Sequence, residues 1–398
     1  KDFSDAGVAS EKVAVLTEAR ARGLADSLGE STFTVSSVEE KPYRSSPKAP
    51  FMTSTLQQEG GRKLRLSSSQ VMRVAQGLYE RGFITYMRTD DVILSDEAMN
   101  ATRNAVTQEY GSKYLNAAPK QYKKKSKSAQ EAHEAIRPTT PYRAPDAVST
   151  ELNSQELALY RLIWQRTLAS QMADATGVTV SVRMTAPATD RTTGEIVDCE
   201  FAASGTTITF PGYRAVYVAS KEERGDDAAD QEALLPPLAV GDIVPTDSIT
   251  PVGHTTTPPA RYTEASLVKR LEELEIGRPS TWASIIQTVQ DRGYVWKKGQ
   301  ALVPTWTAFA VIRLLEEHFD ALVDYAFTAS IDEDLDAIAR GERQKDQWLS
   351  RFYFGETDDR DVPAITAEAG TADDALLGLK RLVVENVDEI DAAEINTF

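Results

Sequence analysis

The pattern of hydrophobic and polar positions changes its period along the chain, and each change predicts a change of element. Apolar residues recur at helical spacing over residues 10–29, whereas residues 32–43 alternate between polar and apolar side chains. The first pattern predicts a helix, and the second predicts a strand with one polar face. Pro and Ser in residues 44–50 predict a linker after that strand.

Three further helices are predicted before residue 174. The first covers residues 67–82, begins at a serine that can cap it and ends at a glycine. The second begins after Ser95, where two acidic residues suit the positive end of the helix dipole. The third covers residues 154–173, and its apolar stripe is formed by Leu157, Tyr160, Trp164 and Leu168. Such stripes predict helices that face a core.

From Gly177 the period becomes two. It predicts three short strands, over residues 178–184, 199–204 and 206–213. Residues 220–237 are acidic and poor in large apolar side chains, which predicts a loop.

The third block of the chain has the order of a winged helix. A helix capped by Thr263 is followed by a second helix capped by Ser280 and then by a hairpin that turns at Lys298 and Gly299. Beyond residue 305 the pattern stays helical before it becomes acidic and irregular.

Composition narrows the class of protein. The chain has 398 residues, enough for roughly two to four domains. Cys199 is the only cysteine, which excludes a disulfide framework and a metal site with several cysteines. No apolar run has the length of a membrane span. Because the chain begins at Lys1 and its last residues read as unfinished, we expect a piece of a longer protein.

Charge is distributed unevenly along the sequence. The net charge is −16, yet residues 41–140 contain 17 Lys or Arg against 9 Asp or Glu, so the remainder of the chain carries −24. A basic segment within an acidic chain predicts binding to a polyanion such as nucleic acid. The alternative is chance variation along a charged surface.

The stretch GFITYMRTDD, residues 82–91, carries the candidate chemistry. Tyr86 and Arg88 are two residues apart, so in an extended segment their side chains project from the same face. A phenol is a weak nucleophile at neutral pH and attacks a phosphodiester only where cations hold the charge of the transition state. The fork of donors on Arg88 suits two phosphate oxygens, and Asp90 can orient Arg88 or move a proton. The alternative is a tyrosine that fills space.

Two neighbouring segments offer further phosphate contacts. His133 and Arg137 are four residues apart and would share one face of a helix, directly after the lysine-rich residues 123–127. Residues 50–70 supply hydroxyls, amides and three cations that suit a nucleic acid backbone, namely Arg62, Lys63 and Arg65. The alternatives are a surface or capping histidine and a solvated lysine face.

Several long motifs resemble one family, and they follow one another in that family's order. They are PFMTSTLQQEGGRKL, VAQGLYERGFITYMRTD, QEAHEAIRPT, PPARYTEASLVKRLEELEIGRPSTWASIIQTVQDRGYV and FTASIDEDLDAIARG. On these motifs the sequence is identified as a member of the bacterial type IA DNA topoisomerases, and it looks most like the actinobacterial branch.

The resemblance implies an activity and the residues that carry it. Enzymes of this family relax negatively supercoiled DNA without ATP by cutting one strand, attaching its 5′ phosphate to a tyrosine, passing a strand through the gap and resealing it. The resemblance assigns the nucleophile to Tyr86, the phosphate-holding arginine to Arg88 and the active-site histidine to His133. The remaining expected site residues are Thr85, Asp90, Arg137, Arg62, Lys63, Arg261, Arg278, Ser280 and Arg292.

The family also implies Mg²⁺, bound by the acidic cluster of a Toprim domain that we do not find in this sequence. We therefore expect Mg²⁺ to serve the intact enzyme and no metal to bind this chain. We expect the chain alone to bind single-stranded DNA weakly and not to relax plasmid. Three positions depart from the family's pattern, with Asp91 in place of Ser, Glu275 in place of Gly and Trp282 in place of Tyr.

The implied fold is α+β, multidomain and padlock-like. Residues 1–49 and 173–250 would form a β-rich arch, residues 50–172 a helical domain that carries the tyrosine, and residues 251–398 part of a helical base. The intact enzyme is expected to act as a monomer in the cytoplasm, on single-stranded and negatively supercoiled DNA of the nucleoid, without a membrane partner.

Two other classes stay open. One is a DNA-binding module carried by the winged helix of residues 263–304, in which Tyr86 is only structural. The other is a tyrosine nuclease or relaxase, although relaxases bring a histidine triad for a metal and the three histidines here are scattered.

Overall fold

The computed structural model describes residues 14–29, 31–123, 134–218, 235–255, 257–355, 378–387 and 390–395. The chain divides into two compact units. Unit 1 consists of Lys1–Pro47 and Ala173–Ala260, and unit 2 of Lys48–Met172 and Arg261–Phe398. Each unit therefore combines two separate segments of the sequence.

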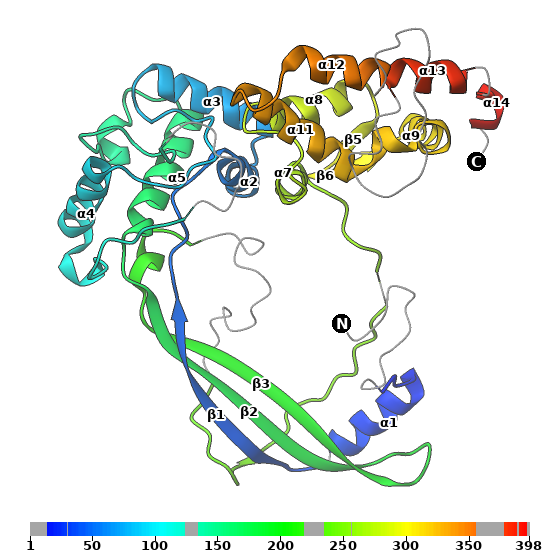
Figure 1. Cartoon of the computed structure of the whole chain (residues 1–398). Coiled ribbons are helices and arrows are strands. Elements are labelled where there is room, and N and C mark those ends of the chain that lie inside the picture. Colours follow the sequence, from blue (N-terminus) through cyan, green and yellow to red (C-terminus); the bar gives the residue numbers. More distant parts are fainter. Residues whose placement is uncertain are drawn as a thin grey trace. The chain divides into compact units, whose positions relative to one another are not determined.

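Unit 1 is built on an antiparallel sheet with the strand order β3-β2-β1-β4, whose first three strands form a long curved ribbon (Figure 1). Its strands are β1 (Phe33–Ser45), β2 (Ala175–Thr189), β3 (Ile196–Phe210) and β4 (Ile243–Val244). β1 pairs with β2 along most of its length, although about 130 residues separate them in the sequence. The prediction that strands on both sides of the helical block pair with each other is confirmed.

The prediction of three short strands after Gly177 was wrong, because β2 and β3 are two long strands paired along their whole length. Gly205 lies within β3, opposite Val180, without ending the strand. Much of the ribbon is partly exposed on both faces, so the alternation of burial is weak and the sequence pattern looked interrupted.

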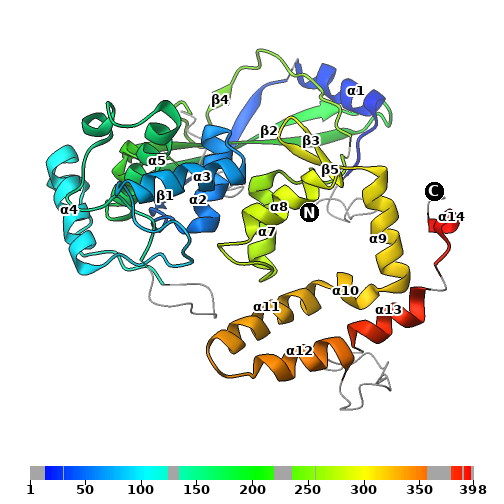
Figure 2. The same cartoon turned by 90° about the horizontal axis from the view of Figure 1, so that it is seen from above.

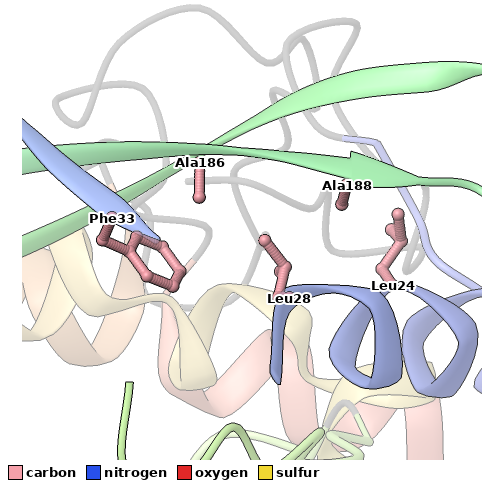
Figure 3. Packing of buried hydrophobic residues seen from close by; sticks show 5 residues of the cluster. All are labelled: Leu24, Leu28, Phe33, Ala186 and Ala188. Carbon is pink, nitrogen blue, oxygen red and sulfur yellow. The ribbon is translucent and has the colours of Figure 1, made fainter. Parts of the chain in front are cut away.

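One helix packs on the ribbon, α1 (Glu18–Gly29). Its Leu24 and Leu28 point toward Ala186 and Ala188 of β2, and Phe33 of β1 closes this small core (Figure 3). The helix begins at Glu18 rather than at residue 10; residues 14–17 are not helical, and residues 10–13 lie outside the described ones. The apolar positions before Glu18 made the predicted helix too long.

The first part of unit 2 contains four helices connected by longer loops. They are α2 (Thr53–Leu64), α3 (Ser68–Glu80), α4 (Asp96–Tyr110) and α5 (Ser154–Ser170), with short 3₁₀ turns η1 (Ser112–Tyr114) and η2 (Pro145–Val148). A third such turn, η3 (Gly212–Ala215), belongs to unit 1. The predicted caps are confirmed, because the hydroxyls of Ser67 and Ser95 accept hydrogen bonds from the first turns of α3 and α4. Most of α5 is buried, since α2, α3 and α4 all contact it.

The second part of unit 2 begins with the predicted winged-helix order. It consists of α7 (Glu264–Glu273), α8 (Trp282–Asp291) and the hairpin of β5 (Val295–Lys298) and β6 (Ala301–Pro304). The cap at Thr263 is confirmed, but the predicted cap at Ser280 was wrong. The residue before α8 is Thr281, and its side chain makes no capping hydrogen bond. α7 packs against α2 and α8 against α3 (Figure 2).

Six helices complete the described part of unit 2. They are α9 (Trp306–His318), α10 (Asp320–Val323), α11 (Tyr325–Ala339), α12 (Lys345–Phe354), α13 (Leu379–Val387) and α14 (Ala392–Ile395). Among the described residues, no helix combines the length and the apolar character that crossing a membrane requires.

Candidate functional site

The segment that carries Tyr86 is irregular, with bends at Thr85, Met87 and Arg88, and its residues alternate between buried and exposed. It leaves α3 through Gly82, whose φ of 75° is one that glycine adopts readily. Tyr86 and Arg88 are exposed, whereas Met87 and Thr89, each of which follows one of them, are buried. The predicted common face of Tyr86 and Arg88 agrees with this alternation.

One side of the segment is held by residues 134–139. The backbone N–H of Thr85 donates to the carbonyl of Arg137 at 2.9 Å, and the hydroxyl of Thr85 donates to the carbonyl of Ala135 at 2.8 Å. The N–H of Arg137 in turn donates to this hydroxyl at 3.0 Å. Residues 134–138 are therefore extended, and the predicted helix that would align His133 with Arg137 was wrong for the described residues; His133 itself lies outside them.

Tyr86 projects from this segment onto another tyrosine. Its side chain is 40 % exposed, and its ring meets the ring of Tyr79 near the end of α3 edge to face, with centroids 5.3 Å apart. This contact restricts the ring on one side while a large part of it stays open to solvent. The phenol is thus positioned and accessible at the same time.

Arg88 is the cation nearest to Tyr86 in the sequence. Its side chain is exposed, and within the part of the chain that the structure describes it has no hydrogen-bond or ion-pair partner. Asp90 is half-buried and is already engaged in an interaction. An accessible guanidinium without a carboxylate partner retains its full capacity to bind a phosphate.

Arg137 lies in a different environment. Its guanidinium is buried and donates from Nε and Nη2 to the two carboxylate oxygens of Glu134, both at 2.7 Å. Burial raises the pKa of Glu134, but hydrogen bonds from Arg137 and Ser95 outweigh it and bring the pKa below its ordinary value. The ion pair between Arg137 and Glu134 therefore stabilises residues 134–137, the segment that lies beside Thr85.

Arg62 and Lys63 lie in the last turn of α2 and face Glu59. Glu59 is fully buried, with Arg62 Nη1 at 3.5 Å and Lys63 Nζ at 4.0 Å from its carboxylate oxygens. Both cations thus neutralise a buried anion within their own helix.

The predicted site residues of the second part of unit 2 differ in their surroundings. Arg278 donates to Asp336 of α11 at 2.7 and 3.0 Å and to two backbone carbonyls. Arg261, Ser280 and Arg292 are exposed. The structure therefore leaves two of the three arginines on the surface and pairs the third with a carboxylate.

Comparison with known proteins adds to this geometry. A family model described as DNA topoisomerase matches residues 2–350. DNA topoisomerase 1 of Mycobacterium tuberculosis is 52% identical over 405 residues, and that of Streptomyces coelicolor is 53% identical over 400; both alignments cover 100% of this chain, and 42% and 41% of those proteins. The chain belongs to the bacterial type IA DNA topoisomerase family.

A solved structure agrees with this membership. Full-length topoisomerase I from Thermotoga maritima superimposes with a TM-score of 0.71 at 31% identity, over 91% of this chain and 59% of that one. The expected α+β topoisomerase fold is confirmed. The chain spans about two fifths of the length of the curated relatives it matches.

The three positions expected to depart from the family pattern, Asp91, Glu275 and Trp282, differ in their surroundings. The carboxylate of Asp91 accepts hydrogen bonds from the N–H groups of Val92 and Ile93 at 2.7 and 2.9 Å, so it closes a turn. Glu275 has a φ of 59°, in the left-handed region where glycine is favoured. Trp282 is buried and donates from its indole N–H to the carbonyl of Ile276 at 2.9 Å.

Sequence reasoning missed residues that shape the candidate site from a distance. Tyr79 was part of a helix pattern, and nothing in the sequence pairs it with Tyr86. Thr53, the first residue of α2, bonds to the backbone at Met87 and Thr89. No local pattern could have revealed it, because its partners lie more than 30 residues away.

Proposed function

We propose that the intact enzyme to which this chain corresponds cuts one DNA strand through Tyr86. It holds the 5′ phosphate as a phosphotyrosine, passes a strand through the gap and reseals the cut, which relaxes negative supercoils without ATP. The observation that carries the proposal is an accessible phenol, on a segment fixed from the side of Thr85, two residues before an exposed guanidinium that has no partner among the described residues.

The chemistry is an exchange of esters. The phenolic oxygen of Tyr86 attacks phosphorus, the bond from phosphorus to the 3′ oxygen breaks, the phenolic proton leaves and the 3′ oxygen takes up a proton. Arg88 stabilises the charge that develops on the non-bridging oxygens. One phosphodiester is replaced by another, so the reverse reaction needs no external source of energy.

We assign the remaining residues to supporting roles. His133 supplies a second cationic or proton-carrying group, and Thr85 and Asp90 support the Tyr86 segment. Arg137 and Arg278 act through their carboxylate partners, which shape the backbone of the site. The expected DNA contacts further from the cut are Arg62, Lys63, Arg261, Ser280 and Arg292.

The family implies Mg²⁺ for the complete reaction. Among the described residues, no group of three His, Cys, Asp or Glu side chains could hold a metal ion, so the residues present do not fit this role. We propose that the ligands lie in a part of the enzyme outside these residues.

Units 1 and 2 suggest a division of tasks for strand passage. We propose that residues 1–49 and 173–250 form the hinge arch, that residues 50–172 carry the tyrosine gate, and that residues 251–398 belong to the DNA-binding base. The enzyme would act as a monomer in the cytoplasm on nucleoid DNA. The chain alone should bind single-stranded DNA weakly and leave plasmid supercoils unchanged when Mg²⁺ is present.

Trapping of the covalent intermediate tests the proposal. The intact enzyme is incubated with an oligonucleotide labelled at its 3′ end, and the reaction is stopped with denaturant. Label should stay with the protein, and peptide mapping should place it on Tyr86; Tyr86→Phe should give no adduct. Adduct formation by the Tyr86→Phe enzyme would refute the assignment. DNA binding by the wild-type enzyme without any adduct would also refute it, because the protein would then only bind DNA.

A further inference from the structure

Thr53 has an unusual concentration of contacts to a single stretch of backbone. It is 0 % exposed, and its hydroxyl lies 2.7 Å from the carbonyl oxygen of Met87 and 2.9 Å from that of Thr89, to either of which it can donate. The same hydroxyl accepts a hydrogen bond from the N–H of Thr89 at 2.8 Å. The backbone N–H of Thr53 also donates to the carbonyl of Thr89, at 2.9 Å.

These contacts fall on both peptide groups that flank Arg88. The carbonyl of Met87 belongs to the peptide before Arg88, and the N–H of Thr89 belongs to the peptide after it. With both groups held, the direction in which the Cα–Cβ bond of Arg88 leaves the backbone is fixed. One buried hydroxyl therefore determines where the arginine side chain starts.

No hydrogen bond or ion pair among the described residues holds the Arg88 side chain. It is exposed, so the backbone from which it leaves is the main polar restraint on its position. The backbone around Tyr86 has a separate support, because Thr85 bonds to Ala135 and Arg137. The supports for the two side chains are thus independent of each other.

We propose that Thr53 is a positioning residue that aligns Arg88 with the phosphate attacked by Tyr86. This inference rests on the function proposed above. A misplacement of a catalytic group by about 1 Å can lower a rate on the order of 100-fold. Thr53 should therefore affect the rate of DNA cleavage far more than the affinity for DNA, because the side chain itself does not reach the surface.

The first test is the rate of single-turnover cleavage by the intact enzyme. Thr53→Val removes the hydroxyl and keeps the shape, and it should slow cleavage roughly 10- to 100-fold while the affinity for an uncleaved oligonucleotide stays within about twofold. Thr53→Ser should restore most of the rate. Ser54→Ala is the matched control, because Ser54 is equally buried in the same turn and its hydroxyl has no hydrogen-bond partner in the described structure.

A double-mutant cycle separates positioning from a general loss of structure. In an Arg88→Ala background, Thr53→Val should slow cleavage little further, because the group that it positions is absent. If Thr53→Val destabilises the protein, the Thr53→Ser and Thr53→Ala pair, which differ only by the hydroxyl, gives the same comparison.

The outcomes distinguish this inference from the proposed function. Wild-type cleavage by both Thr53→Val and Thr53→Ala would overturn the positioning role, and so would an equal, additive loss in the Arg88→Ala background. Both results leave the assignment of Tyr86 intact if Tyr86→Phe still abolishes the adduct. Adduct formation by Tyr86→Phe would instead overturn the proposed function itself.

Discussion

Glu264 joins the two parts of unit 2 through a buried carboxylate, and its removal should weaken their contact. It lies at the start of α7, and its Oε2 accepts a hydrogen bond from the N–H of Ser68, in the first turn of α3, at 2.6 Å. Its Oε1 accepts from Gln290 of α8 at 3.3 Å and forms an ion pair with Lys297 of β5. One side chain thus connects the tyrosine-bearing helices with the winged helix.

The change Glu264→Gln keeps the size and one acceptor but removes the charge. A hydrogen bond to a buried charged group contributes about 1.5–3 kcal/mol, and a pair with a partner as exposed as Lys297, at 36 %, adds about 0–1 kcal/mol. Because glutamine retains part of the hydrogen bonding, we expect a loss of about 1–2 kcal/mol at pH 7.

The loss should depend on pH in a defined direction. Burial raises the pKa of Glu264, but hydrogen bonds from Lys297 and Ser68 outweigh it, so the pKa lies below its ordinary value of 4.5. A carboxylate whose pKa is lowered on folding stabilises the protein above its unfolded value, and this stabilisation disappears as pH falls through the folded value. The difference between wild type and Glu264→Gln should therefore be full at pH 7 and shrink below pH 4.5.

Hydrogen exchange of the Ser68 amide and urea unfolding measure this effect. Exchange of that amide should quicken roughly tenfold at pH 7, since 1.4 kcal/mol corresponds to a factor of about ten. Glu273→Gln is the matched control on the same helix, because its ion pairs with Lys269 and Arg270 are exposed and should each contribute less than about 1 kcal/mol. Equal stability of Glu264→Gln and wild type at pH 7, or a difference that persists unchanged at low pH, would refute the reasoning.

Three further changes test other parts of the structure. Glu275→Gly should leave stability equal or raise it by up to about 1 kcal/mol in urea unfolding, because it relieves a left-handed backbone at the cost of a more flexible unfolded chain. Leu28→Ala should cost about 2–4 kcal/mol in the unfolding of unit 1, because it opens the core between α1 and β2. Asp91→Ala should cost about 1–2 kcal/mol because two N–H groups lose their acceptor, whereas Asp91→Ser, which retains an acceptor, should be nearly neutral in stability. If the proposed function holds, the intact enzyme with Asp91→Ser should cleave DNA at the wild-type rate.

The first residues of α3, α4 and α7 were predicted because their signals are local. A serine or threonine before an apolar stripe accepts a hydrogen bond from the first turn, as Ser67, Ser95 and Thr263 do. The predicted cap of α8 was wrong because α8 begins one residue later, after Thr281. The hydroxyl of Thr281 accepts a hydrogen bond from the N–H of Arg278 at 2.8 Å, in the turn before the helix, and makes no capping bond to α8.

Strand lengths were harder to predict because pairing, rather than side-chain burial, holds the ribbon of unit 1 together. β2 and β3 pair from Gly177 to Thr189, while many of their side chains are exposed or half-buried. When both faces of a strand are partly exposed to solvent, its hydrophobic and polar residues alternate only weakly. In such a strand Gly205 is easily mistaken for the end of the strand. The backbone hydrogen bonds of an antiparallel partner are invisible in the sequence.

The candidate site was found only in part because sequence shows cations without their partners. Arg137 and Glu134 are only three residues apart in the sequence, but the geometry of their ion pair depends on an extended backbone that was expected to be helical. Arg278 and Asp336 are 58 residues apart. By contrast, Tyr86 and Arg88 needed only the period of the segment that contains both.

That segment also shows why an alternating pattern need not imply a strand in a sheet. Among the described residues, Ile84 forms a bridge with Pro138, and the backbone from there to Thr89 is held by the hydroxyls and backbone N–H groups of Thr85 and Thr53. A sheet would fix all positions through one cooperative ladder, whereas two hydroxyls fix two short stretches separately. The backbone beside Tyr86 depends on Thr85 and that beside Arg88 depends on Thr53, so their relative placement requires both anchors. The alternation in the sequence indicates which side chains face outward, and the distant hydroxyls determine how rigidly they do so.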